Sequence, residues 1–142
     1  MIELGHIAVG ALTGCTLDGP VSAFVAGMAT HALLDVAPHA EIDDTMWELW
    51  STAVGVVALA ARFGWKSPIV WGAIGGVLPD AEHVLPRAVR PRHALFPSHN
   101  IDVLHSENPE LAVPAWVQVV VGAAVVGALI FGSRRGGAQV AT

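Results

Sequence analysis

Residues 113–132, VPAWVQVVVGAAVVGALIFG, decide the expected fold. Gln118 is the one strongly polar side chain among these 20 residues. As an α-helix they would rise about 30 Å, the thickness of the hydrocarbon core of a bilayer. Arg134 and Arg135 follow at once and would lie among lipid headgroups. The pattern predicts a transmembrane helix over 113–132 and a flexible tail over 134–142.

The composition agrees with a membrane protein. Charged side chains make up 13% of the 142 residues, against about 25% in an ordinary soluble domain. The hydrophobic fraction is 54%, so a water-soluble surface would be hard to build. The net charge of −5 argues against a nucleic-acid partner, because phosphate binding needs clustered Lys and Arg. Cys15 is the single cysteine, which excludes an intrachain disulfide and a thiolate metal site.

Four further apolar segments precede the last one, and glycine and proline separate them. They cover 2–17, 20–37, 45–61 and 67–85. Pro79 interrupts the fourth segment, and no stretch alternates with period two over a useful length. We therefore predict an all-α fold, a polytopic transmembrane bundle of about five helices, some short or broken by proline. Residues 1–133 would form a single membrane-embedded domain with a polar loop over 86–110.

Threading five helices up and down sorts the polar residues between two ends. One end, here the basic end, holds Asp18, Arg62, Lys66, Arg134 and Arg135. The opposite end, here the histidine end, takes the other 11 acids and all seven histidines, at its loops or in the nearer half of a helix. The tryptophans would form belts at both interfaces. Trp47, Trp50 and Trp116 lie toward the histidine end, and Trp65 and Trp71 toward the basic end.

Acids and histidines pair on single helix faces at the histidine end. The pairs are Glu3 with His6, His31 with Asp35, and Asp80 with His83. Spacings of three and four residues put both members of a pair on one face. An Asp or Lys in the middle of a membrane helix costs at least about 2.5–3.5 kcal/mol, so converging ionisable groups need a partner. A divalent cation is such a partner, and imidazole with carboxylate suits zinc, iron or manganese.

Two further features bear on the candidate site. His39 would continue the stripe of His31 and Asp35, although Pro38 is expected to end the helix first. The loop over 86–110 contains three arginines together with His93, His99 and His105. Its length exceeds that of an ordinary connection, which is typical of a functional loop. Its arginines suit lipid headgroups or an anionic phosphate or carboxylate.

These residues resemble the YdjM-like membrane-bound metal-dependent hydrolases of bacteria and archaea. More distantly, their ligand pattern is similar to that of zinc-dependent phospholipases C. The matching elements are GHIAVG around His6, THALLD with His31 and Asp35, LPDAEH with Asp80 and His83, and RHALFPSH ending at His99. Glu82 stands where the family has a second aspartate. The resemblance covers nearly the whole chain and implies an integral protein of a prokaryotic cytoplasmic membrane.

From the pairs and the resemblance together we predict a membrane metal-dependent hydrolase acting on a phosphoester or ester of a lipid-like substrate through a metal-activated water. The predicted ligands of one or two divalent ions, with zinc favoured, are His6, His31, Asp35, Asp80, His83 and His99. The predicted catalytic residues are Glu82 as general base, Arg92 as stabiliser of negative charge, and His93. The basic end carries four Lys and Arg against three at the histidine end, which favours an extracytoplasmic metal site.

Three other interpretations use the same residues. A protein that binds or transports a metal would need the same ligands without hydrolytic activity, and its path should continue to the basic end. A di-iron carboxylate bundle needs two Glu-x-x-His motifs, and only the one at Glu3 and His6 exists. The pairs could also be interhelical hydrogen bonds that fix packing. Assembly into a homo-oligomer, the metal and the substrate stay open at this point.

Overall fold

The computed structural model describes residues 2–40, 42–84, 95–96 and 112–132. The elements in this part of the chain are α1 (Glu3–Gly14), α2 (Pro20–Asp35), α3 (Thr45–Phe63), α4 (Pro68–Val77), α5 (Ala81–Val84) and α6 (Ala115–Phe131). No strand forms among these residues, and the single bridge between His39 and Val113 is isolated. The prediction of an all-α fold is confirmed.

Local sequence signals determine where the helices begin and end. The Asp44 carboxylate caps α3 by accepting the backbone N–H groups of Met46 and Trp47, each at 3.0 Å. Ser67 caps α4 in the same way, and Pro68 follows at the first helical position. Gly64, with φ of 83°, ends α3 in a left-handed conformation that favours glycine. These signals explain the short α3–α4 connection.

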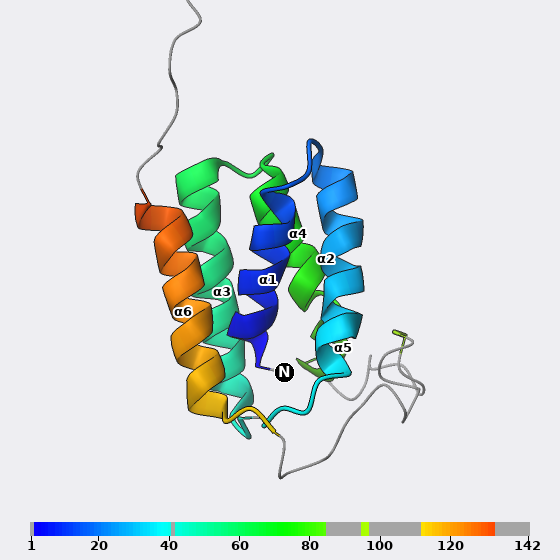
Figure 1. Cartoon of the computed structure of the whole chain (residues 1–142), viewed down its shortest axis with the longest axis vertical. Coiled ribbons are helices and arrows are strands. Elements are labelled where there is room, and N and C mark those ends of the chain that lie inside the picture. Colours follow the sequence, from blue (N-terminus) through cyan, green and yellow to red (C-terminus); the bar gives the residue numbers. More distant parts are fainter. Residues whose placement is uncertain (1, 41, 85–94, 97–111, 133–142) are drawn as a thin grey trace, which may run out of the picture.

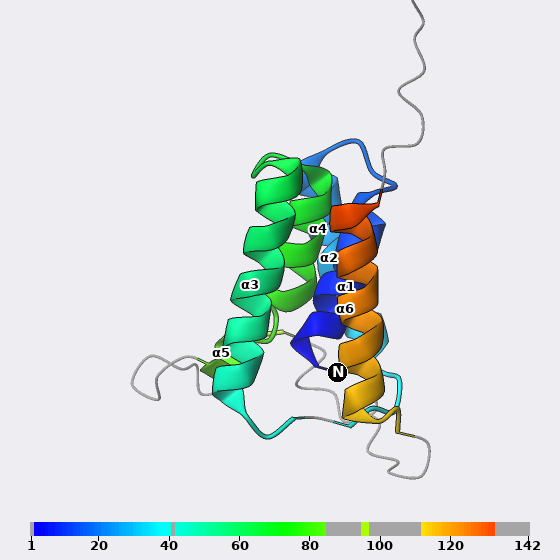
Figure 2. The ribbon, with the colours of Figure 1, turned by 90° about the vertical axis from the view of Figure 1, so that its left-hand side faces the viewer.

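The helices run alternately up and down around a central α1 (Figure 1). α1 contacts α2, α3, α4 and α6, and α2 also packs along α4. The turns after α1 and α3 and the end of α6 lie at the upper end in Figures 1 and 2, while α5 and the ends of α2 and α4 lie at the lower end. The upper end is therefore the basic end, and the lower end is the histidine end.

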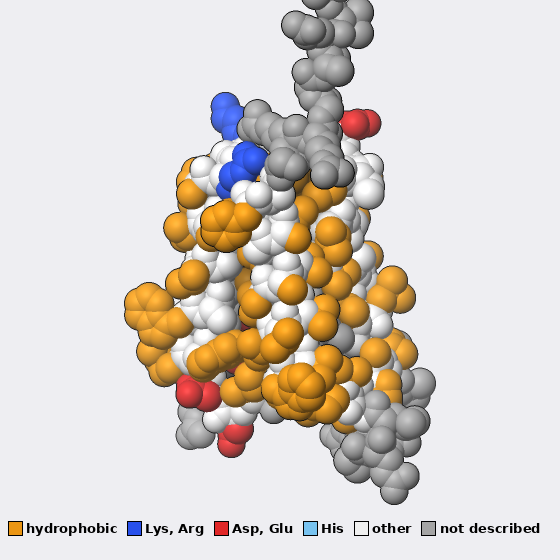
Figure 3. Space-filling view, turned by 60° about the vertical axis from the view of Figure 1, so that its left-hand side comes forward, with side chains coloured by type: hydrophobic (Ala, Val, Ile, Leu, Met, Phe, Trp, Pro, Cys, Tyr) orange, Lys and Arg blue, Asp and Glu red, His pale blue; other side chains and the backbone are white. Residues whose placement is uncertain are grey.

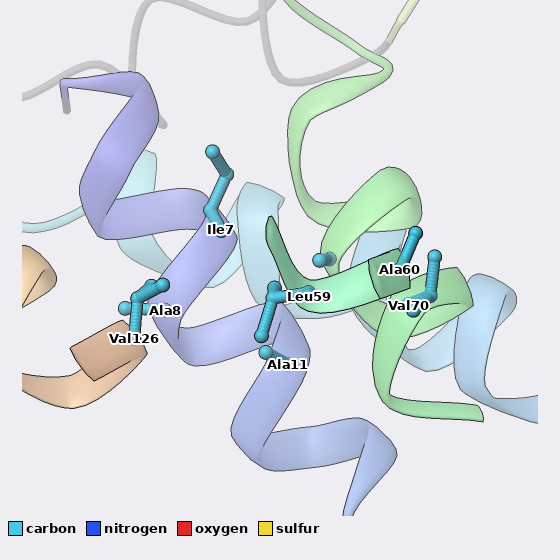
Figure 4. Close-up of a cluster of buried hydrophobic side chains, with 8 residues drawn as sticks. Ile7, Ala8, Ala11, Leu59, Ala60, Val70 and Val126 are labelled. Atoms are coloured by element: carbon cyan, nitrogen blue, oxygen red, sulfur yellow. The ribbon is translucent and has the colours of Figure 1, made fainter. Parts of the chain in front are cut away.

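The hydrophobic core is built around α1 (Figure 4). Its buried side chains are Ile7, Ala8, Ala11, Leu59, Ala60, Val70, Ala73 and Val126. Alanine is common in this set, which allows the helix backbones to approach closely. Many large apolar side chains lie on the outer surface instead, as Figure 3 shows for the side of α3 and α6.

Two helices differ in extent from the apolar segments that predict them. The helix expected over 113–132 is α6, which has 17 residues and begins after Pro114. Val113 is held outside it, because its N–H and carbonyl groups bond to Pro38 and Ala40. The segment over 67–85 is divided at Pro79 into α4 and the four-residue α5. Within the described residues, none of the helices combines the length and the apolar character needed to cross a membrane.

Some expectations fall on parts of the chain outside the described residues. The tail over 134–142 lies outside them, and so does the loop over 86–110 apart from Leu95 and Phe96. Arg134 and Arg135, expected among headgroups, belong to that tail.

Candidate metal centre

Four side chains from three parts of the chain meet at the histidine end of the bundle. His6 lies on α1, His31 and Asp35 lie on the last turns of α2, and Asp80 follows α4 directly before α5. Because α1, α2 and α4 pack against one another, residues near these helix ends come close together. The sequence pairs predicted this convergence.

Two local features bring the side chains of this cluster together. His31 and Asp35 are four residues apart on α2 and therefore share a helix face. Gly76 lies where α4 crosses α1, and a Cβ atom there would stand 2.5 Å from the carbonyl oxygen of His6. The absence of a side chain at Gly76 thus allows the close crossing that places His6 beside His31.

The nitrogen and oxygen atoms of the four side chains lie within a narrow range of distances. The Nε2 atom of His31 is 3.0 Å from Asp35 Oδ2 and 3.7 Å from Asp80 Oδ1. The Nε2 atom of His6 is 3.5 Å from Asp35 Oδ1 and 3.8 Å from Asp80 Oδ2. The two imidazole rings stack with centroids 4.1 Å apart. Both Nε2 atoms therefore face the same two carboxylates.

The hydrogen bond of His31 to the backbone fixes which ring nitrogen carries a proton. The Nδ1 atom of His31 lies 2.7 Å from the carbonyl oxygen of Gly76, which can only accept a hydrogen bond. Nδ1 is therefore protonated, and in the neutral ring the lone pair of Nε2 faces the carboxylates. Metal-binding histidines commonly make such a bond from their second nitrogen.

Burial increases the need for a positive charge at this position. His6 is 1% exposed, and neither of its ring nitrogens makes a hydrogen bond within the described residues. His31 and Asp35 are also buried, and the side chain of Asp80 is the most exposed of the four at 19%. The two basic side chains of the described residues, Arg62 and Lys66, lie at the basic end. No Lys or Arg described by the structure therefore balances these carboxylates.

The geometry suits a divalent ion. His6, His31 and Asp80 each offer one ligand atom, and these atoms lie within 4.8 Å of one another. Ligands at 2.0–2.1 Å from a tetrahedral ion are separated by about 3.3 Å. The Nε2 atoms of His31 and His6 lie 3.7 and 3.8 Å from Asp80 Oδ1 and Oδ2, which is somewhat longer than that separation. The residues can therefore hold a metal ion, with Asp35 as a second carboxylate beside it.

Two further acids, Glu3 and Glu48, lie near the centre, and sequence reasoning had singled out only Glu3. The side chain of Glu3 hydrogen-bonds that of Asp80, and the backbone N–H of Glu3 donates to Glu48 Oε2 at 3.0 Å. Two carboxyl groups in contact need a proton or a cation between them. The spacing of Glu3 and His6 placed Glu3 on the correct face, but nothing local in the sequence indicated Glu48.

Of the remaining predicted site residues, Glu82 is the one whose side chain the structure describes. Glu82 is 5% exposed, and its Oε2 accepts the backbone N–H of Leu95 at 2.6 Å. His83 belongs to α5, but its side chain is not among the described parts. Arg92, His93 and His99 lie outside the described residues.

His39 lies beyond the end of α2, as the break at Pro38 predicted. Its Nδ1 atom stands 2.6 Å from the carbonyl oxygen of Ala37. A variant of His39 therefore serves as a control for variants of the histidines in the centre.

Comparisons with protein-family models, with curated proteins and with solved structures gave no match for this chain.

Proposed function

We propose that the chain is a membrane metal-dependent hydrolase of the YdjM-like type, with a centre formed by His6, His31, Asp35 and Asp80. One observation carries the proposal: two buried imidazole Nε2 atoms face two carboxylates at 3.0–3.8 Å. In the neutral ring, His31 Nε2 and the carboxylates are all acceptors, and a cation between them makes the arrangement favourable. Burying several carboxyl groups together has a desolvation cost, and a bound cation would offset it.

The donor set narrows the choice of metal. Two imidazoles with carboxylates suit zinc, iron or manganese, and zinc is our choice. His6, His31 and Asp80 supply three protein ligands, the usual number at a catalytic zinc. Asp80 is the most exposed of the three, with 19% of its side chain accessible. A divalent ion there supplies a Lewis acid and lowers the pKa of a bound water toward about 7.

The outer surface supports a location in lipid. Large apolar side chains are exposed along the outer faces of α2, α3 and α6, and the charged groups of Figure 3 lie at the two ends. Exposed tryptophans lie toward both ends, as in the aromatic belts of membrane proteins. They are Trp47, Trp50, Trp65, Trp71 and Trp116. We propose that lipid contacts this surface and that the histidine end is extracytoplasmic.

This location favours an amphipathic substrate. A centre at one end of a lipid-embedded bundle lies at the depth of headgroups, where phosphoesters and esters of lipids are found. The proposed substrate class is therefore a phosphoester or ester of a lipid-like molecule. The predicted roles of Arg92 and His93, and the ligand roles of His83 and His99, remain predictions.

The experiment measures metal content and hydrolysis in protein purified in detergent. Asp80→Asn and His31→Ala should each retain less than about a tenth of the wild-type metal, because a centre with three protein ligands loses most of its affinity when one of them is removed. His39→Ala is the matched control and should keep full metal content. Hydrolysis of a phosphodiester probe should fall together with metal content.

Two results would contradict the proposal in different ways. Wild-type protein without stoichiometric metal would exclude the metal centre. Wild-type protein that holds metal but does not hydrolyse the probe would exclude the proposed hydrolase activity. Metal uptake into liposomes that contain the protein would then indicate a transport protein.

A further inference from the structure

The first turn of α1 is held by side chains from other helices. Ile2 precedes α1 and makes no side-chain cap, so the first N–H groups of the helix need acceptors from elsewhere. The N–H of Ile2 donates to Oε1 of Gln118 on α6 at 3.0 Å. The N–H of Glu3 donates to Oε2 of Glu48 on α3, also at 3.0 Å. The position of this turn therefore depends on α3 and α6.

Glu3 connects the contact from α3 to two of the three proposed metal ligands. His6 follows Glu3 by three residues, so the two lie one turn apart on the same face of α1. The side chain of Glu3 also hydrogen-bonds that of Asp80. A shift of the Glu3 backbone would therefore move His6 and disturb Asp80 at the same time.

Glu48 lies outside the set of clustered side chains but bonds directly to Glu3. It belongs to the first turn of α3, a helix that supplies none of the four clustered residues, and it is half-buried. Hydrogen bonds from a backbone N–H to a carboxylate are stronger than those between neutral groups. Groups that orient the ligands of a metal affect its affinity without touching the ion.

We propose that Glu48 is a positioning residue of the metal centre, which holds Glu3 from α3 and thereby places His6 and Asp80 for the ion. The inference rests on the proposed function, because it needs the metal centre. It adds a third helix contact to a centre whose ligands come from α1, α2 and the residue after α4. The reach of the Glu48 side chain to the N–H of Glu3 is then what determines metal affinity, rather than its negative charge.

The test measures the dissociation constant of Zn(II) for the full chain in detergent, by competition with a chromophoric chelator. Glu48→Asp keeps the charge but shortens the side chain by one methylene group. It should weaken Zn(II) binding about 3- to 10-fold, less than the roughly 10- to 100-fold lost when a direct partner of a ligand is removed. Glu48→Gln keeps the length and an acceptor oxygen without the charge, and should stay within about 2-fold of wild type.

Asp43→Asn is the matched control, because Asp43 is exposed and precedes α3 at the same end of the bundle. This variant should bind Zn(II) like wild type. The visible absorption of bound Co(II) gives a second readout, since it depends on the geometry of the ligands. Glu48→Asp should change that spectrum, and Glu48→Gln should not. A residue that only stabilises the fold would lower the melting temperature and leave both readouts unchanged.

The results that overturn the inference differ from those that overturn the proposed function. Zn(II) binding and a Co(II) spectrum in Glu48→Asp equal to those of wild type overturn the positioning role. Binding in Glu48→Gln as weak as in Glu48→Asp, or weaker, overturns it too, because charge would then be the cause. The metal centre stands in these cases, whereas wild-type protein that binds no Zn(II) overturns both.

Discussion

Gln118 connects three parts of the chain that are far apart in sequence. Its Oε1 accepts the N–H of Ile2, and its Nε2 donates to the carbonyl oxygens of Ala40 and Val113. The side chain is 5% exposed, so these groups have little access to water. The one strongly polar residue in an otherwise apolar helix thus fixes the beginning of α1 against α6.

Replacing Gln118 by Leu should lower the free energy of unfolding by about 2 kcal/mol, because a buried N–H at Ile2 loses its acceptor. Thermal unfolding followed by circular dichroism in detergent measures the change. The control is Ser22→Ala, which removes an exposed hydroxyl that bonds Gly19 and should cost less than about 0.5 kcal/mol. Equal melting temperatures for the two variants would contradict this account.

At the same scale, the sequence predicted the four clustered site residues but not all their neighbours. His31 with Asp35 could be predicted because helical spacing alone puts them on one face. Glu48 could not, since its approach to Glu3 depends on how α3 packs beside α1. Glu82 was predicted as the general base, and its bond to Leu95 links two positions that no local pattern relates.

Helix contacts in the bundle depend on glycines at the crossings. A Cβ atom at Gly72 would overlap the carbonyl oxygen of Gly10, and one at Gly14 would overlap that of Pro68. α4 crosses α2 in the same manner, where Gly75 meets the backbone of Phe24. Gly10 and Gly14, and likewise Gly72 and Gly76, stand four residues apart, a spacing typical of close helix packing in membranes, but the spacing does not tell which helix each glycine faces.

Gly72→Ala should therefore destabilise the protein by about 2–3 kcal/mol, because α1 and α4 would have to move apart. Gly127 on α6 is the matched control, since a Cβ there would have nothing within 4 Å. Gly127→Ala should be neutral or should stabilise by up to about 1 kcal/mol, as expected for a helix interior. The melting temperatures of the two variants give the comparison, and a Gly72→Ala protein as stable as wild type would disprove the tight crossing.

At the scale of the helices, the apolar segments and the Gly and Pro residues between them predicted the fold class and the approximate helix positions. The boundaries did not follow as well. Residues 113–132 were expected to be helical throughout, but Val113 pairs with the chain around His39 instead. That pairing joins residues far apart in sequence, so hydrophobic periodicity carries no information about it.

At the scale of the whole bundle, the described residues bury several ionisable side chains beside the apolar core, while many large apolar side chains are exposed on the outside. His6, His31 and Asp35 are buried, whereas Val54 and Val57 in the middle of α3 are 64% and 55% exposed. Such an arrangement is favourable where the surroundings are themselves apolar. It is the feature of the whole molecule that most directly supports the proposed location.

Wild-type protein should therefore float with phosphatidylcholine vesicles in a density gradient. Val54→Lys should reduce the floating fraction, because a charge in the middle of a lipid-facing helix costs about 2.5–3.5 kcal/mol. The matched control is Asp43→Lys, at an exposed position before α3, which should float like wild type. Recovery of wild-type protein at the bottom of the gradient without detergent would refute the proposed location.

Gly76 contacts both histidines: without a Cβ atom it lets α1 approach closely at His6, and its carbonyl oxygen accepts a hydrogen bond from His31 Nδ1–H. On the proposed assignment, ion uptake and the closure of this crossing are one thermodynamic event. Chelation would loosen the crossing first, and protease cleavage would then begin in the neighbouring turns. On that assignment, the supply of metal in the cell would change how long the protein survives proteolysis.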